Sequence, residues 1–143
     1  VEPAELIAAA REATPARDDV SFAAALPGDL PAISIDFDQL RQVFVNLIAN
    51  GFDAAGAGGE VRITARVVDD AVEFLVNDTG PGIDPSIRAR LFEPLVTTKP
   101  KGIGLGLPLC KRIVERNGGT IRVTAGELPG AAFAVRLPIH RGS

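Results

Sequence analysis

The most regular hydrophobic pattern in the sequence lies between Asp36 and Ala55. Apolar residues recur there with the spacing of one helix face, which predicts a long amphipathic helix. A short polar side chain at Asp36 or Asp38 suits the cap at its start. The predicted apolar face consists of Leu40, Val43, Phe44, Leu47 and Ile48.

Shorter patterns predict the remaining elements. A proline followed by good helix formers indicates a helix, and short apolar runs between turn residues indicate strands. We expect helices at 3–13 and 107–116, the second with Leu109, Ile113 and Val114 inward, and strands at 20–25, 32–36, 60–67, 71–77, 120–125 and 131–138. This order of elements predicts an α/β two-layer sandwich, in which a mixed sheet carries helices on one face.

The segment 84–103 differs from the rest because it has little periodicity beyond a short helix expected at 86–91. A run of this length without regular structure is typical of a lid over a functional site or of a disordered link. We therefore interpret the segment as a candidate lid.

Composition narrows the possible functions. The chain has 143 residues, a net charge of −3 and a single cysteine, which suits one domain (1–143) in a reducing, cytoplasmic compartment. The pI near 5.1 argues against nucleic-acid binding. Apolar runs are too short to span a bilayer, so no membrane contact is expected. Because methionine is absent, including at position 1, we expect the chain to be part of a longer protein.

Two glycine clusters flank the candidate lid, Gly80 with Gly82 before it, and Gly102, Gly104 and Gly106 at its end. Glycine lets a ligand approach the main chain, and the second cluster opens a helix whose N-terminus favours anions. From Arg88 to Arg112 the sequence has six basic residues and one acid. A local positive charge in an acidic chain fits a bound polyphosphate.

Several polar residues have a chemical and a structural interpretation. Asn46 and Asn50 share a helix face and could place carbonyl oxygens on Mg²⁺, or be ordinary amides. Asp78 could accept a hydrogen bond from an exocyclic amine, or be a turn aspartate. Lys99 could contact a phosphate, or be a solvated lysine.

Taken together, four stretches resemble the catalytic ATP-binding domain of bacterial sensor histidine kinases, within the gyrase, heat-shock-chaperone, histidine-kinase and MutL (GHKL) superfamily. DQLRQVFVNLIANGFDA (38–54) is similar to its N box, NDTGPGI (77–83) to its first glycine box, LFEPLVTTK (91–99) to its F box, and GIGLGLPLCKRIVERNGG (102–119) to its second glycine box. The short lid is most similar to that of the nitrogen-, oxygen- and dicarboxylate-sensing branch.

The resemblance implies a role for matching residues. Asn50 would ligate Mg²⁺ with support from Asn46, Asp78 would bind the adenine amine, and Phe92 would anchor the lid. Lys99 would reach the terminal phosphate. The nucleotide-binding set that it implies is Asn46, Asn50, Asp53, Asp78, Gly80, Gly82, Ile83, Phe92, Thr98, Lys99, Gly102, Ile103, Gly104, Leu105, Gly106 and Leu107. Gly51, Pro108 and Ala131 depart from the family pattern, and Ala131 stands where many members carry a threonine near the adenine.

The resemblance also implies partners. The phosphate acceptor would be a histidine on a separate dimerisation hairpin upstream, and a response regulator would receive the phosphate. His140 is the only histidine and lies in the tail, so this chain alone is not expected to phosphorylate itself.

Three alternatives use the same nucleotide site. One is a serine kinase of the anti-sigma-factor type, and another is a binding module that has lost catalysis. The third is an ATPase of the gyrase or MutL kind. Such ATPases carry a glutamate base where this chain has Asn46, and asparagine is a much poorer base. Asn46 therefore favours transfer to a protein group over hydrolysis.

Overall fold

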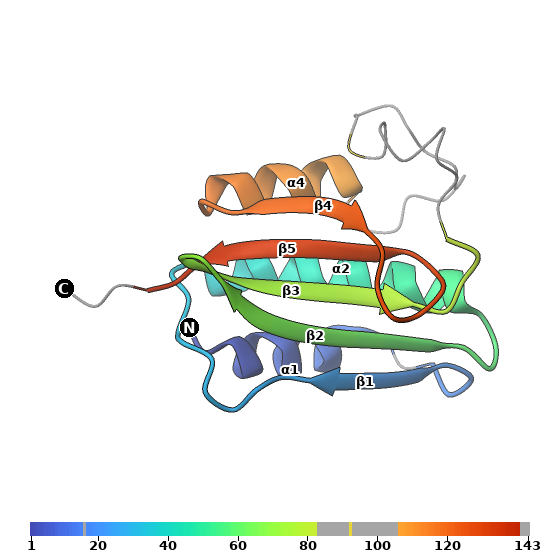
Figure 1. Ribbon diagram of the computed structural model, residues 1–143. Helices are drawn as coiled ribbons and strands as arrows, with labels where there is room; N and C mark the ends of the chain where they lie inside the picture. The colour runs from blue at the N-terminus through green and yellow to red at the C-terminus, as the bar shows by residue number, and fades with distance from the viewer. Residues whose placement is uncertain (16, 83–91, 93–105, 141–143) are drawn as a thin grey trace.

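A mixed sheet of five strands forms one layer of the computed structural model, which describes residues 1–15, 17–82, 92 and 106–140 (Figure 1). The order across the sheet is β1-β2-β3-β5-β4, with β1 parallel to β2 and the other neighbours antiparallel. The strands are β1 (Ser21–Ala25), β2 (Glu60–Val68), β3 (Ala71–Asp78), β4 (Thr120–Thr124) and β5 (Ala132–Pro138). The predicted mixed sheet is confirmed.

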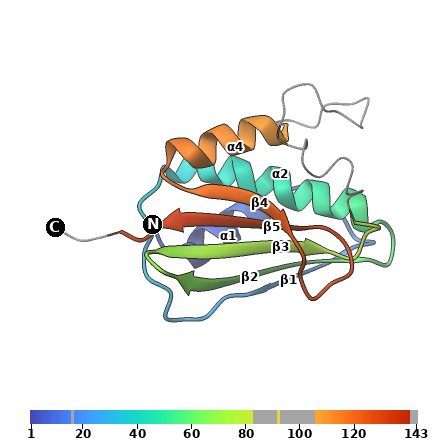
Figure 2. The same cartoon turned by 45° about the horizontal axis from the view of Figure 1, so that its top comes forward.

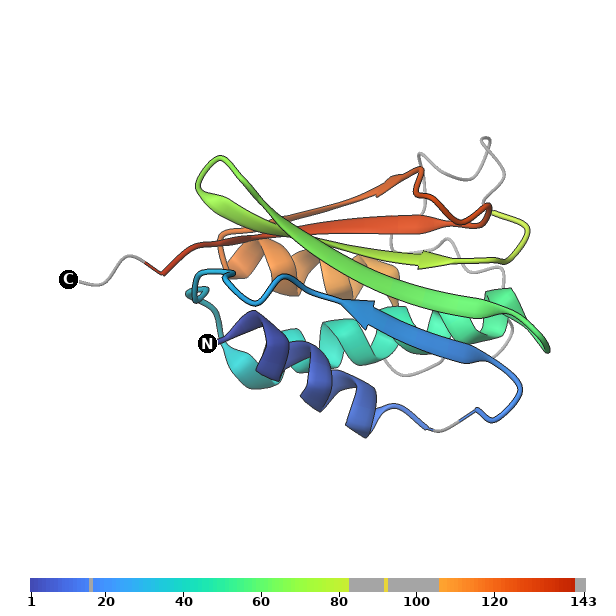
Figure 3. The same ribbon diagram turned by 60° about the horizontal axis from the view of Figure 1, so that its bottom comes forward.

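The helices α1 (Pro3–Ala13), α2 (Phe37–Ala55) and α4 (Leu107–Arg116) pack on one face of this sheet, as Figures 2 and 3 show from two directions. The expected two-layer sandwich is therefore confirmed. Among the described helices, none has both the length and the hydropathy that crossing a bilayer requires.

Helix α2 is central because it contacts α1, α4, β2 and β3. Its five predicted stripe residues are all buried, and the ring of Phe44 meets that of Phe74 on β3 edge-on at 5.1 Å between centroids. Asp36 caps the helix, since its Oδ1 accepts from the Gln39 N–H at 3.0 Å. The hydrophobic pattern and the cap together account for where this helix begins and which face it buries.

The β2–β3 hairpin turns at Asp69 and Asp70, as the sequence predicts. Asp69 adopts the left-handed backbone conformation (φ 54°), which aspartate tolerates better than most residues. Along β3, Val72, Phe74 and Val76 point into the core. This register brings β3 to its end at Asp78, beside β2 and β5.

Two predictions are wrong. Residues 32–36 are not a strand: Ile33 forms only an isolated bridge to Ile139, because α2 begins immediately afterwards and leaves no room for a ladder. Leu109 is 39% exposed, because the buried stripe of α4 runs through Cys110 and Val114, one turn apart. The short helix expected at 86–91, and all of the candidate lid except Phe92, lie outside the described residues.

Candidate functional site

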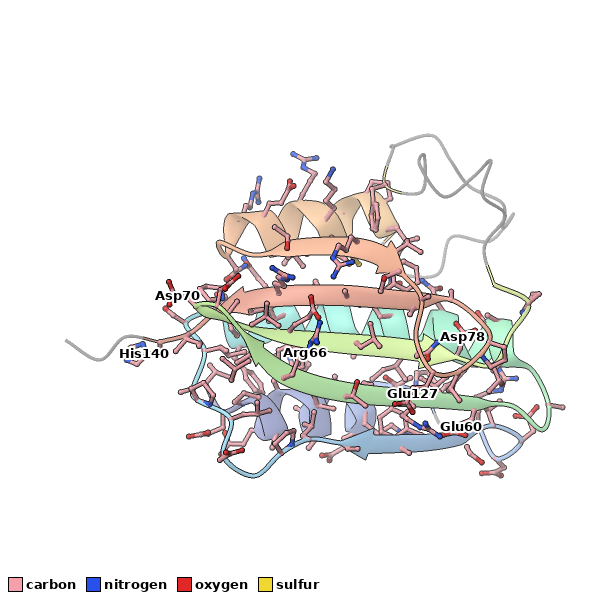
Figure 4. All side chains as sticks on the ribbon, in the orientation of Figure 1. Glu60, Arg66, Asp70, Asp78, Glu127 and His140 are labelled. Atoms are coloured by element: carbon pink, nitrogen blue, oxygen red, sulfur yellow. The ribbon has the colours of Figure 1, made fainter. Side chains whose placement is uncertain are left out.

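Asp78 is a carboxylate buried at the end of β3, with 4% of the residue exposed. Its Oδ1 accepts hydrogen bonds from two backbone N–H groups, Gly80 at 2.8 Å and Ala131 at 3.3 Å. Figure 4 shows Asp78 at the end of the sheet where the β4–β5 loop passes. Two rigid donors on one oxygen fix the plane of the carboxylate, and among the described residues no hydrogen bond to Oδ2 is found.

Burial raises the pKa of Asp78, and the hydrogen bonds from Gly80 and Ala131 only partly offset this effect. Removing a carboxylate from water without a countercharge is unfavourable, so a buried aspartate gains from an added donor. A planar amine that reaches Oδ2 would supply such a donor.

The first glycine cluster lies directly after Asp78. A Cβ on Gly80 would lie 2.5 Å from the carbonyl oxygen of Ala54, so any side chain would push this turn away from the end of α2. Gly82 has a φ of 82°, a conformation that favours glycine. The turn after β3 is thus held close to α2, whichever ligand binds there.

The polar face of α2 carries the three candidate residues of the N box. Asn46 is buried (5% exposed) and its Nδ2 donates to Cys110 Sγ at 3.2 Å. Asn50 is half-buried. Asp53 is exposed and its Oδ1 accepts from Arg17 at 3.3 Å, so in this structure it serves an ion pair at the surface.

The bond between Asn46 and Cys110 joins α2 to α4. Burial raises the pKa of the Cys110 thiol to about 11, although the Asn46 bond acts in the opposite direction. The sulfur is therefore a neutral thiol at neutral pH, which suits an acceptor inside the core. Because Nδ2 donates to sulfur, the side-chain oxygen of Asn46 is the atom that can accept a hydrogen bond or ligate a cation.

Helix α4 begins at Leu107, with the exposed Gly106 as its N-cap. The N-terminal end of a helix carries partial positive charge and favours an anion. Phe92 packs against the core, and its ring meets Phe133 on β5 edge-on at 6.4 Å between centroids. The remaining predicted site residues lie outside the described residues; they are Ile83, Thr98, Lys99, Gly102, Ile103, Gly104 and Leu105.

Two residues of this region escaped the sequence interpretation. Asn77, of which only 4% is exposed, holds the loop between β4 and β5 with its side chain. Cys110 orients Asn46. The sequence gives no signal for Asn77, because the alternation of β3 places it on the face opposite the helices with Glu73, where a polar residue is expected. For Cys110 the sequence holds no signal, since its partner lies 64 positions away.

An open hollow of about 830 Å³ lies elsewhere, between α1 and β1. Ile7, Arg11, Phe22 and Leu26 contribute to its lining, and the Arg11 guanidinium lies 5.2 Å from the centre of the Phe22 ring. None of the predicted site residues lines it. The hollow between α1 and β1 is therefore separate from the candidate site around Asp78.

Comparison with known proteins bears on the site as a whole. Residues 35–141 match the family model described as "Histidine kinase-, DNA gyrase B-, and HSP90-like ATPase". The signal transduction histidine-protein kinase AtoS of Escherichia coli (strain K12) is 38% identical over 122 residues, which are 85% of this chain and 20% of that protein. The chain thus spans about a fifth of the length of that relative.

Solved structures agree in fold. The nucleotide-free catalytic domain of the histidine kinase ThkA superposes with a TM-score of 0.84 at 28% identity, covering 97% of this chain and 93% of that one. Full-length ShkA in complex with AMPPNP superposes with a TM-score of 0.82 at 36% identity, covering 100% of this chain and 31% of that one.

Proposed function

Because this chain belongs to the family of histidine kinase-, DNA gyrase B- and HSP90-like ATPases, we propose that it is the ATP-binding catalytic domain of a sensor histidine kinase. In this proposal residues 1–143 are a single domain that acts in the cytoplasm, where ATP is available. The domain binds ATP with Mg²⁺ and donates the γ-phosphate to a histidine on a separate dimerisation segment of the parent protein. A response regulator then receives the phosphate.

The observation that carries the proposal is the buried carboxylate of Asp78, held by Gly80 and Ala131. A carboxylate accepts from the 6-amino group of adenine but has nothing to donate to the 6-oxo group of guanine. Burial makes that discrimination stronger, because an unmatched polar group at this position costs about 1–3 kcal/mol. The site therefore suits adenine.

The α2 face suits the phosphate end of the nucleotide. Mg²⁺ prefers oxygen ligands and retains several waters, so carboxamide oxygens from Asn50 and Asn46 fit it by type. Bound MgATP supplies the phosphoryl group and a cation that offsets its charge. In our proposal Asn50 ligates the cation, Asn46 supports it, and the α4 N-terminus at Gly106 faces the phosphates. Lys99 and the other glycines of the second cluster would complete this end.

One contact favours transfer over hydrolysis. Water attack needs a base near the cation, and the residue one helical turn before Asn50 is Asn46, an amide whose Nδ2 already bonds Cys110. No described residue on this face of α2 other than Asp53 carries a carboxylate, and Asp53 pairs with Arg17. We therefore expect the γ-phosphate to be transferred to a protein acceptor in preference to water.

Calorimetry with Mg²⁺ and a nonhydrolysable ATP analogue tests the binding step. We expect Asp78→Asn to weaken the affinity by about 10- to 100-fold, as the loss of a charged hydrogen bond implies, and Asn50→Ala to remove the dependence on Mg²⁺. Gly28→Ala is a matched control, because its Cβ would meet no atom within 4 Å. Unchanged affinity in Asp78→Asn would refute the assignment.

Labelled ATP tests the transfer step. The chain alone should acquire no phosphohistidine, since its one histidine, His140, lies in the tail and not on a dimerisation segment. It should also release phosphate slowly, because Asn46 stands where a hydrolase needs a base. Label should appear on a histidine-bearing segment added separately. Rapid phosphate release without an acceptor would instead identify an ATPase, and acid-stable label on a partner's serine would identify a serine kinase.

A further inference from the structure

We propose that Asn77 is a positioning residue that sets the selectivity of this site for adenine over hypoxanthine. This inference rests on the proposed function, in which Asp78 accepts from the adenine amine. Asn77 itself need not touch the nucleotide. It acts on Asp78 through the loop between β4 and β5, residues 125–131.

The first observation is that the Asn77 side chain holds this loop at its middle, Leu128, and at its end, Ala131. Its Oδ1 accepts from the Leu128 N–H at 2.8 Å. Its Nδ2 donates to the Ala131 carbonyl at 2.9 Å and to the Leu128 carbonyl at 3.4 Å. Asn77 is only 4% exposed, and a residue without these groups would leave the part-buried Leu128 N–H without its side-chain acceptor, whereas the Ala131 carbonyl would keep its bond from the Asp78 N–H.

The second observation is that the same loop supplies a donor to Asp78. Ala131, whose carbonyl Asn77 holds, donates its N–H to Asp78 Oδ1 at 3.3 Å. The backbone adds two bonds, from the Asp78 N–H to the Ala131 carbonyl at 3.0 Å and from the Gly130 N–H to the Asp78 carbonyl at 2.9 Å. The position of the carboxylate therefore depends on where the loop lies.

The third observation is that two glycines leave room for this arrangement. A Cβ on Gly126 would collide with the Asn77 amide, lying 2.7 Å from its Cγ. A Cβ on Gly130 would collide with Asp78 Oδ1. The loop is thus in direct contact with both side chains, so we expect a change at Asn77 to reach Asp78 through the loop.

These contacts assign separate tasks to the two neighbours in sequence. Asp78 meets the base, and Asn77 fixes the loop that aims Asp78. If the loop relaxes, the carboxylate loses one of its two backbone donors and can rotate. The amine contact is then weakened, whereas contacts to the phosphates, which lie on α2 and α4, are kept. The expected consequence is a loss of base selectivity without an equal loss of total affinity.

The experiment compares MgATP with MgITP, whose base carries a 6-oxo group in place of the 6-amino group. Calorimetry on the 143-residue chain gives the ratio of the two dissociation constants. We expect the unaltered chain to prefer ATP by about 10-fold or more, as one charged hydrogen bond implies. In Asn77→Ala the ATP preference should fall by about fivefold or more, with ITP affinity nearly unchanged. A purely structural role would weaken both nucleotides alike and leave the ratio unaltered.

Gly126→Ala provides a second perturbation that leaves Asn77 in place and pushes against its amide. It should lower the same ratio, whereas Gly28→Ala should not. If Asn77→Ala does not fold, as judged by circular dichroism, Gly126→Ala decides the question. A wild-type ratio in the folded variants overturns the inference and leaves the proposed function standing. Failure of the unaltered chain to bind either nucleotide would instead overturn the proposed function itself.

Discussion

Glu73 on β3 forms the centre of an ion cluster on the sheet face opposite the helices. Only 5% of its side chain is exposed. Its Oε2 accepts from Arg136 Nε at 2.8 Å and from an Arg122 terminal nitrogen at 3.2 Å, while Oε1 accepts from Arg66 at 3.0 and 3.2 Å. Figure 4 shows Arg66 on this face.

Replacement Glu73→Gln keeps the shape of the side chain but removes its charge. The arginines are 36%, 50% and 71% exposed, so each pair is worth only about 0.2–1 kcal/mol by itself. The buried carboxylate adds to this, because the amide would present an N–H group to a guanidinium. We expect a loss of about 2 kcal/mol in the free energy of unfolding, or about 4–8 °C in Tm for a chain of this size.

The loss should depend on pH with a definite sign. Burial raises the pKa of Glu73, but hydrogen bonds from Arg136, Arg66 and Arg122 outweigh burial and hold the pKa below its ordinary value of 4.5. The stabilisation is therefore complete above that ordinary value and disappears as the pH falls through the lower pKa of the folded state. The difference between the original chain and Glu73→Gln should be constant near neutral pH and shrink in acid.

Urea unfolding followed by far-ultraviolet circular dichroism measures this difference, since the chain has no tryptophan or tyrosine for fluorescence. Glu127→Gln is the control: Glu127 pairs with Arg62 at 3.4 Å but is 89% exposed, so its replacement should change stability by less than about 0.5 kcal/mol. A stability of Glu73→Gln equal to that of the control at pH 7, or a deficit that persists undiminished well below pH 4.5, would contradict a stabilising ion cluster at Glu73.

Two further predictions concern the core. The Cys110 thiol, buried and with its pKa raised to about 11, should resist a thiol-reactive disulfide reagent at pH 8 and react only as urea unfolds the chain; rapid labelling of folded protein would contradict this. Gly51→Ala should gain about 1 kcal/mol in the free energy of unfolding from helix propensity. Its Cβ, however, would lie 2.9 Å from a methyl group of Val61, a buried residue whose branched side chain is rigid. Overpacking costs about 1–3 kcal/mol, so we expect a net loss in a thermal melt, relieved in a Val61→Ala background; a higher Tm in Gly51→Ala alone would show that the strand yields.

Local rules were sufficient for most of the fold. The helical period of α2, the cap at Asp36 and the alternation of β3 each depend on residues close in sequence, so they could be read directly. Local rules fail where the position of a segment distant in sequence determines the structure. Ile33 lacks a ladder because α2 starts too soon, and Leu109 is exposed because the face of α4 that packs inward is centred elsewhere.

For the candidate site, the sequence by itself determined which residue types are available: the asparagines of α2, Asp78 and the glycines around the lid. Only the tertiary structure decided how they are held, because their partners are remote. Ala131 donates to Asp78 from 53 positions away, and Asn46 bonds Cys110 across 64. Such bonds form only after the sheet and helices have packed, and no local pattern of hydrophobic and polar residues encodes them.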